Sequence, residues 1–269
     1  MSAETRVKTI HDIHAATIAG RKLVMLTCYD ALFARLLAPY VDTLLVGDSV
    51  HQVLGGNETT LGATLDQMIY HAKAVRKGAP DAVVVVDMPF LSYQVSVPEA
   101  IRNAGRVLAE TGATAVKLEG GRAMVPVVRA LVDVGIPVMG HLGLTPQSVH
   151  QLGGYRVQGR ENAQAERLLS EAVLLEDAGI FALVLELIPR ALSKKVTEKL
   201  AVPTIGIGAG PDCDGQVLVL HDMLGLNEGF KPKFLQTYAS MAGDVKKAAE
   251  AFGKDVREGK YPGAEHSFD

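Results

Sequence analysis

AVVVVD (residues 82–87) and FALVLE (residues 181–186) are the two stretches of this 269-residue sequence that decide its fold. Neither alternates polar with apolar residues, as a strand with one face in water does. Uninterrupted runs of this kind are typical of strands buried on both faces, in parallel sheets that helices cover. Six more short runs rich in Val, Ile and Leu have the same character. The sequence therefore predicts eight buried strands, at Lys22–Thr27, Thr43–Gly47, Ala82–Asp87, Thr114–Leu118, Ile136–Gly140, Ala182–Leu185, Pro203–Gly206 and Gln216–Leu220.

Signals for the beginnings and ends of helices lie between these runs. Thr64 and Gln67 have the spacing of a capping box. Pro98 suits a first helical turn, and Gly112 suits the residue that follows a helix. The alternation favours a (β/α)8 TIM barrel, with a doubly wound open sheet as the alternative. Since no Pro- or Ser-rich linker interrupts it, we expect a single barrel domain over residues 1–269, with a short N-terminal extension and a C-terminal helical segment.

Composition and charge narrow the classes of partner. The chain has 27 Lys and Arg against 30 Asp and Glu, a net charge of −3, and no basic cluster, which argues against nucleic acid or an anionic membrane. No stretch approaches the roughly 18 uninterrupted apolar residues of a membrane span. The two cysteines, Cys28 and Cys213, allow no disulfide framework and no CxxC motif. We expect a cytoplasmic protein that binds small molecules.

Polar side chains follow five successive strands of the predicted barrel. In a barrel the carboxyl ends of all strands meet at one mouth, where the active sites of such enzymes lie. Each residue alone has an ordinary structural explanation, such as a cap, an ion pair or a buried histidine, but five successive strand ends of this kind are improbable as scaffolding. The residues are Asp48, Ser49, Asp87, Lys117, Glu119, His141 and Glu186.

The residue types at these strand ends favour one kind of chemistry. Asp48, Asp87 and Glu119, without a cysteine cluster, offer the hard oxygen ligands that suit Mg²⁺. A metal held by few protein oxygens leaves positions for a chelating 2-oxo acid. The metal and Lys117 could then stabilise the negative oxygen of an enolate. Glu186 is left as the candidate base that removes the proton from carbon.

Two glycine-rich stretches, residues 51–62 and 151–160, cannot be helix interiors. In a barrel they follow the second and fifth strands, at the mouth. Loops in that position can act as lids, and the segment Val50–Ala63 is the candidate lid.

Eight motifs spread in order over nearly the whole chain resemble those of the ketopantoate hydroxymethyltransferase family. Several of them are long enough to be highly specific. They are VGDS (46–49), DMPF (87–90), KLEGG (117–121), GHLGLTPQS (140–148), GGYRVQGR (153–160), IGIGAG (205–210), DGQVLVLHD (214–222) and YPGAEHSF (261–268).

The resemblance implies a (β/α)8 barrel of the pyruvate/phosphoenolpyruvate-binding type and a reaction. This family transfers a hydroxymethyl group from 5,10-methylenetetrahydrofolate to 3-methyl-2-oxobutanoate, giving 2-dehydropantoate for pantothenate synthesis. It also implies Mg²⁺, held by Asp48 and Asp87, with Glu119 near the metal, either directly or through water.

The resemblance further implies roles around the substrate and an assembly. Glu186 is the proton acceptor. Family members are cytoplasmic and form homo-oligomers, commonly a decamer of two pentameric rings. The residues that bind the oxo acid or lie beside it are Asp48, Ser49, Asp87, Lys117 and His141.

Two other functions share parts of this pattern. A Mg²⁺-dependent lyase or mutase of the same superfamily would use the same metal and enolate without folate. A catalytically silent barrel that binds a small molecule would use the charged residues as salt bridges only.

Overall fold

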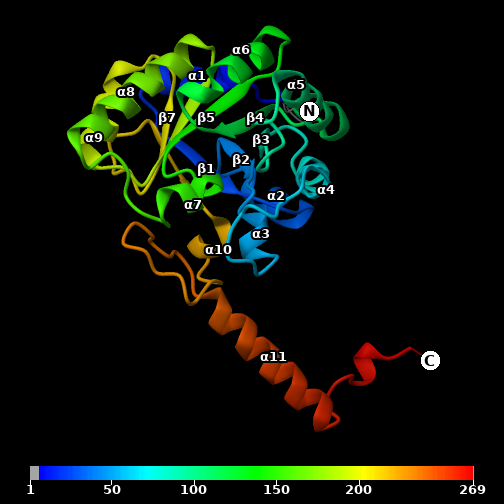
Figure 1. Cartoon of the computed structure of the whole chain (residues 1–269). Coiled ribbons are helices and arrows are strands. Elements are labelled where there is room, and N and C mark those ends of the chain that lie inside the picture. The colour runs from blue at the N-terminus through cyan, green and yellow to red at the C-terminus, as the bar shows by residue number, and fades with distance from the viewer. Residues whose placement is uncertain (1–5, 269) are drawn as a thin grey trace. The chain divides into compact units, whose positions relative to one another are not determined.

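The eight predicted strands form a closed barrel in the computed structural model, which describes residues 6–268 (Figure 1). Every neighbouring pair is parallel, and the last strand pairs with the first. The (β/α)8 prediction is therefore confirmed, and the open sheet is wrong. The strands are β1 (Leu23–Thr27), β2 (Thr43–Val46), β3 (Val83–Asp87), β4 (Ala115–Glu119), β5 (Val138–Gly143), β6 (Ala182–Glu186), β7 (Thr204–Ile207) and β8 (Gly215–Leu218).

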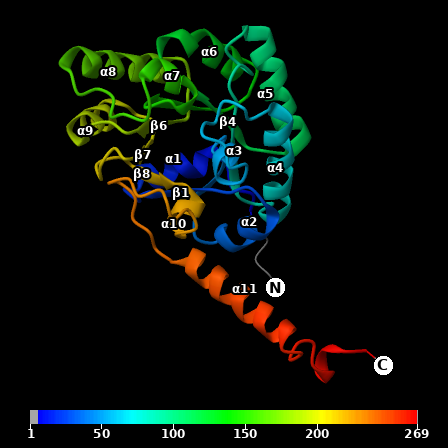
Figure 2. The same ribbon diagram turned by 60° about the horizontal axis from the view of Figure 1, so that its bottom comes forward.

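The helices that accompany the strands lie outside the barrel, except α1, which lies across the end where the strands begin, as Figures 1 and 2 show. They are α1 (Ile10–Ile18), α2 (Ala31–Leu37), α3 (Val50–Val53), α4 (Leu65–Gly78), α5 (Val97–Thr111), α6 (Val125–Asp133), α7 (Val149–Leu152), α8 (Asn162–Asp177) and α9 (Arg190–Lys199), with 3-10 turns η1 (Arg122–Met124) and η2 (Pro146–Ser148).

The local signals read from the sequence begin and end these helices. Thr64 and Gln67 form the capping box of α4: the Thr64 N–H donates to Gln67 Oε1, and the Gln67 N–H donates to Thr64 Oγ1. Pro98 lies in the first turn of α5, and Gly112 ends that helix at φ 69°, in the left-handed region that glycine tolerates.

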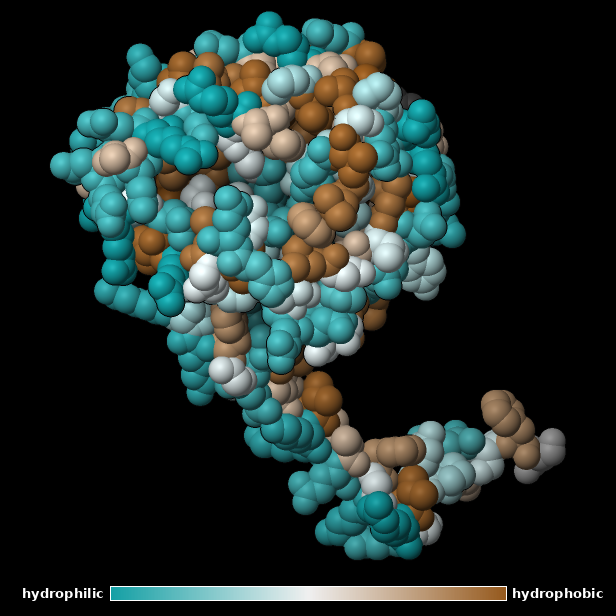
Figure 3. All heavy atoms as spheres, viewed as in Figure 1, coloured by the Kyte–Doolittle hydropathy of each residue, from teal (hydrophilic) through white to brown (hydrophobic). Residues whose placement is uncertain are grey.

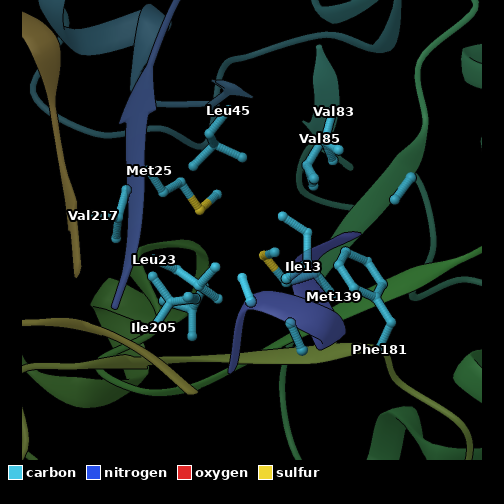
Figure 4. Packing of buried hydrophobic residues seen from close by; sticks show 14 residues of the cluster. Ile13, Leu23, Met25, Leu45, Val83, Val85, Met139, Phe181, Ile205 and Val217 are labelled. Carbon is cyan, nitrogen blue, oxygen red and sulfur yellow. The ribbon is translucent and has the colours of Figure 1, made fainter. Parts of the chain in front are cut away.

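The core fills the interior of the barrel at the end where the strands begin. Strand residues such as Met25, Val83 and Val85 point inward, and Ile13 of α1 lies among them (Figure 4). Ile13 is 4% exposed and Val85 fully buried, and each such side chain contributes about 1.5–3 kcal/mol through burial. The α1 helix thus closes the amino-terminal end of the barrel.

The described chain divides into two compact units, one that ends at Val219 and contains the barrel, and one that starts at Leu220. The second contains α10 (Leu220–Met223), α11 (Met241–Arg257) and the 3-10 turn η3 (Ala264–His266). None of the residues of α11 is buried. The expectation of one domain with a C-terminal helical segment stays a prediction. Within residues 6–268, a search for helices able to cross a membrane finds none.

Candidate active site

The twofold alternation of side chains along a strand brings the predicted site residues into the barrel. Val85 belongs to the interior core, so Asp87, two residues later on β3, points the same way. On β4, Ala115 is in the core, and Lys117 and Glu119 follow it on the same face. The same alternation on β5 and β6 carries inward the two remaining strand-end residues, His141 and Glu186.

The strand register sets which of these side chains meet. Asp87 of β3 is paired with Lys117 of β4, and Asp87 Oδ1 lies 2.7 Å from Lys117 Nζ. Glu119 is paired with His141 of β5, and Glu119 Oε1 lies 3.5 Å from His141 Nδ1. Lys117 Nζ also lies 3.1 Å from His141 Nδ1. These four side chains, each 6% exposed or less, therefore form one buried, continuous set of charged contacts.

Glu186 lies at the open edge of this set. Its Oε2 is 3.3 Å from His141 Nε2, and its side chain is 17% exposed, against 3% for that of His141. His141 Nε2 is buried, and its contact with Glu186 is longer than a usual hydrogen bond to a carboxylate. A carboxylate that is still accessible beside the buried His141 ring indicates a place where a ligand can be received.

Asp48 and Ser49 reach the site from the turn after β2. The Asp48 N–H donates to Asp87 Oδ2 at 3.1 Å. The Ser49 hydroxyl lies 2.9 Å from the Tyr29 hydroxyl. Gly47 permits this close approach, because a Cβ there would lie 2.8 Å from Ser49 Oγ and 3.5 Å from Asp87 Oδ2. All seven residues singled out in the sequence therefore lie in one region at the carboxyl ends of the strands.

Two buried residues that the sequence analysis did not single out complete the region. Gln147, in η2, donates from Nε2 to Asp48 Oδ2 at 2.9 Å, and its backbone N–H donates to Glu119 Oε2 at 3.0 Å. The Tyr93 hydroxyl lies 2.8 Å from Gln147 Oε1. Gln147 stands in one of the motifs that carry the family resemblance, which was the signal available for finding it.

Negative charge dominates the electrostatics of this region. Burial, together with the charges of Asp87 and Glu119, raises the pKa of Asp48 well above its usual value. Burial also raises the pKa of Asp87, although the charge of Lys117 opposes it. Burial lowers the pKa of Lys117, but the surrounding carboxylates outweigh this and raise it. A single lysine therefore offsets several carboxylates that destabilise one another.

The ring of His141 lies between the Lys117 ammonium group and the carboxylates of Glu119 and Glu186. Burial and the charge of Lys117 lower the pKa of His141, but hydrogen bonding toward Glu119 and Glu186 outweighs them and raises it to about 9. The doubly protonated ring has an N–H toward each carboxylate, whereas the neutral ring accepts from Lys117 at Nδ1. In both forms Nε2 carries the proton and faces Glu186.

The donor set fits a hard divalent cation in its chemistry. Asp48, Asp87 and Glu119 supply carboxylate oxygens, which Mg²⁺ prefers, and two positive charges would relieve their mutual repulsion. Their described positions nevertheless satisfy other partners, Lys117 and Gln147. Among residues 6–268 no three His, Cys, Asp or Glu side chains are already gathered as a metal centre. The metal assignment stays a prediction.

A comparison with known protein families covers nearly the whole chain. The model of the ketopantoate hydroxymethyltransferase family matches residues 7–264. The chain belongs to that family. It is 54% identical, over the full length of both proteins, to a 3-methyl-2-oxobutanoate hydroxymethyltransferase of Moorella thermoacetica. It is 53% identical, again over both full lengths, to the protein of that name from Pelobacter propionicus. Like other members of the ketopantoate hydroxymethyltransferase family, it is an enzyme.

Solved structures with a similar fold place this family member among known barrels. A 2,3-dimethylmalate lyase of the PEP mutase/isocitrate lyase superfamily superposes with a TM-score of 0.61 at 19% identity, over 96% of this chain and 91% of the lyase. A phosphonopyruvate hydrolase in complex with oxalate and Mg²⁺ has a TM-score of 0.63 at 12% identity, over 96% and 93% of the chains. At these identities the likeness establishes the fold alone, a closed (β/α)8 TIM barrel.

Proposed function

We propose that this enzyme transfers a hydroxymethyl group from 5,10-methylenetetrahydrofolate to 3-methyl-2-oxobutanoate, giving 2-dehydropantoate. The names of the full-length relatives support the transfer of a hydroxymethyl group to 3-methyl-2-oxobutanoate, and the family resemblance implies the folate donor. The structural observation that carries it is Glu186, a carboxylate that remains accessible beside His141, whose other ring nitrogen lies 3.1 Å from the buried Lys117 Nζ. This arrangement suits the removal of a proton from carbon. Glu186 can act as the base, while the negative charge that develops on the substrate is stabilised deeper in the barrel.

The proposed reaction begins when Glu186 removes the proton from C3 of the oxo acid. The positive charge of Lys117 holds the developing enolate oxygen, and His141 Nε2–H donates toward Glu186 or the substrate. C3 then forms a bond to the methylene carbon as one of that carbon's two bonds to folate nitrogen breaks, and the oxygen of one water replaces the second. The proton taken from C3 and one proton of the water go to the two folate nitrogens, which leaves tetrahydrofolate and 2-dehydropantoate. Ser49, with Asp87 and Lys117, positions the oxo acid.

The proposed cation is Mg²⁺, with Asp48 and Asp87 as ligands and Glu119 near it. When bound, the cation supplies positive charge that makes the C3 hydrogen of the oxo acid more acidic. Burial of the three carboxylates, each 6% exposed or less, supports this assignment, because clustered acids without a counter-ion destabilise the folded chain.

Hydrogen–deuterium exchange at C3 of 3-methyl-2-oxobutanoate tests the proposal. We expect the enzyme to exchange this hydrogen in D₂O with Mg²⁺ and without folate, and Glu186→Gln to lose the exchange while it still binds the oxo acid. The proposed transferase activity would be overturned if the enzyme neither exchanges the hydrogen at C3 nor forms a folate-dependent product. Exchange with cleavage or rearrangement of the oxo acid, but no folate-dependent product, would assign a lyase or mutase instead.

We also propose that the enzyme is a homo-oligomer, a decamer. The support from the structure is α11, where Val245, Phe252 and Val256 lie at helical spacing and are 57%, 58% and 46% exposed. Figure 3 shows hydrophobic atoms among hydrophilic ones along this helix. An apolar helical stripe of this kind is typical of a surface that packs against a partner. Light scattering should give a mass about ten times that of the 28.6-kDa chain. The cytoplasmic location rests on the resemblance and stays a prediction.

A further inference from the structure

Gln147 connects the ends of four neighbouring strands with a single side chain and its backbone. It lies in η2, after β5, and is 6% exposed. Its Nε2 donates to Asp48 Oδ2, after β2, and to the Met88 carbonyl, after β3, both at 2.9 Å. Its backbone N–H donates to Glu119 Oε2, at the end of β4, at 3.0 Å.

The orientation of this amide is fixed by its partners. Carboxylates and carbonyls only accept hydrogen bonds, so the two contacts to Asp48 and Met88 require the NH₂ group of Gln147. On the other side, Gln147 Oε1 accepts from the Tyr93 hydroxyl at 2.8 Å and from Gln94 Nε2 at 3.2 Å. Every polar atom of the Gln147 side chain therefore has a partner of the right kind, and the amide has one way to fit.

Two of the three acids assigned to the cation are held by this one residue. Gln147 occupies Oδ2 of Asp48 and Oε2 of Glu119, which fixes the rotation of both carboxylate groups. It does so without adding charge, in a region where negative charges already destabilise one another. Hydrogen-bonding partners of ligating carboxylates orient them for the metal, and losing such a partner commonly lowers metal affinity by about 10–100-fold.

We propose that Gln147 is a positioning residue that orients Asp48 and Glu119 for the divalent cation. The inference rests on the proposed function, because it takes these acids to be the residues that hold Mg²⁺. Gln147 acts through the carboxylates and does not itself touch the substrate. Tyr93 supports it by fixing the amide from the opposite side.

Binding of Mn²⁺ to the full-length enzyme tests this role apart from activity. The electron paramagnetic resonance signal of free Mn²⁺, titrated without either substrate, gives the affinity directly. We expect Gln147→Met, which keeps the length of the side chain and its backbone N–H, to bind Mn²⁺ about 10–100-fold more weakly than wild type. In the assay, its activity should recover as Mg²⁺ is raised, so the apparent KM for Mg²⁺ changes more than kcat.

Gln216→Met is the matched control, because the exposed Gln216 amide donates to the Gly210 carbonyl at 3.0 Å and not to a carboxylate. It should bind Mn²⁺ as wild type does. If Gln147→Met does not fold, as judged by circular dichroism, Gln147→Asn carries the test: its side chain is one methylene shorter, so its amide cannot hold the 2.9 Å contact with Asp48 Oδ2 and Mn²⁺ binding should weaken in the same direction.

The outcomes separate this inference from the proposed function. Folded Gln147→Met that binds Mn²⁺ as tightly as wild type overturns the positioning role and leaves the function standing. If Gln147→Asn has to replace it, unchanged Mn²⁺ binding by folded Gln147→Asn overturns the positioning role in the same way. Wild-type enzyme that binds no Mn²⁺ but still forms the product overturns the metal assignment, and the inference with it.

Discussion

Lys117 Nζ lies 2.7 Å from Asp87 Oδ1, and both side chains are 5% exposed. The contact arises from the register of β3 with β4, which places the two residues side by side, on the inward faces of the strands. An ion pair this deeply buried loses most of its hydration. The pair therefore stabilises the folded chain only while both charges are present.

Removal of Lys117 should destabilise the fold strongly. In Lys117→Met the Asp87 carboxylate stays buried without its partner, and we expect the free energy of unfolding to fall by about 3–5 kcal/mol. The matched control is Lys73→Met, which breaks the exposed Lys73–Glu110 pair at 3.1 Å and should cost less than about 1 kcal/mol. Urea denaturation measures both. Equal losses in the two variants would contradict the role given to burial.

Gly143→Ala should disturb Glu186 through the backbone. Gly143 has φ +96°, and a Cβ there would overlap the carbonyl oxygen of Glu186 on the next strand. We expect a loss of C3 exchange and a lower melting temperature. Gly105→Ala is the control, because Gly105 lies within α5 with open space at its Cβ, and alanine should stabilise the helix by about 0.5–1 kcal/mol. A Gly143→Ala enzyme with wild-type exchange would refute the prediction.

A hydrogen bond joins the two glycine-rich loops at the mouth. Gln52 Nε2 lies 3.0 Å from the Tyr155 hydroxyl. Tyr155→Phe removes this bond and keeps the ring, so the candidate lid, Val50–Ala63, should exchange its amide hydrogens faster, without a change in melting temperature. Hydrogen exchange followed by mass spectrometry measures this. The control is Tyr70→Phe on the exposed face of α4, and identical exchange of the lid in both variants would show that the bond does not restrain it.

Acid should weaken the fold through Asp42. Burial alone raises the pKa of Asp42, but hydrogen bonds from Arg21 and from the Val24 N–H, together with the charge of Arg21, lower it below the usual 3.8. A folded-state pKa below the unfolded one means that stability is fully present above pH 3.8 and is lost as pH falls through the folded pKa.

Asp42→Asn should therefore be less stable than wild type at pH 6, with the difference shrinking as the pH falls below 3.8. Chemical denaturation at a series of pH values measures it. Asp66→Asn, at a side chain that is 81% exposed, is the control. A stability difference for Asp42→Asn that is independent of pH would mean that its carboxylate charge is not what stabilises the fold.

Most of the fold could be predicted because hydrophobic pattern specifies buried strands directly. The sequence places β3 and β6 to within one residue of their observed bounds. Lys117 and Glu119, two residues apart on β4, lie on one face of that strand because of the same twofold alternation. The last strand was predicted too long, since Leu220 begins the short helix α10. An apolar residue in a short run does not reveal whether a strand or a helix will bury it.

The network around the acids could not be predicted from residue types. Ionisable residues at strand ends indicate a functional site from the sequence alone. Gln147 is neutral, and it lies in a 3-10 turn whose position the strand pattern does not predict. Its contacts with Asp48 and Glu119 depend on the path of the chain after β5. Tyr93 is similar: an aromatic residue in a loop gives no indication that its hydroxyl will lie against a glutamine 54 residues away.

The closure of one end of the barrel by Ile13 has a kinetic consequence for the proposed reaction. With the amino-terminal end filled by packed side chains, both substrates must use the mouth at the carboxyl ends of the strands. The molecule that reaches the buried Lys117 has to arrive before the bulkier folate covers it, and its product has to depart after folate has gone. For the proposed reaction we therefore expect ordered binding, with the oxo acid first to enter and its product last to leave.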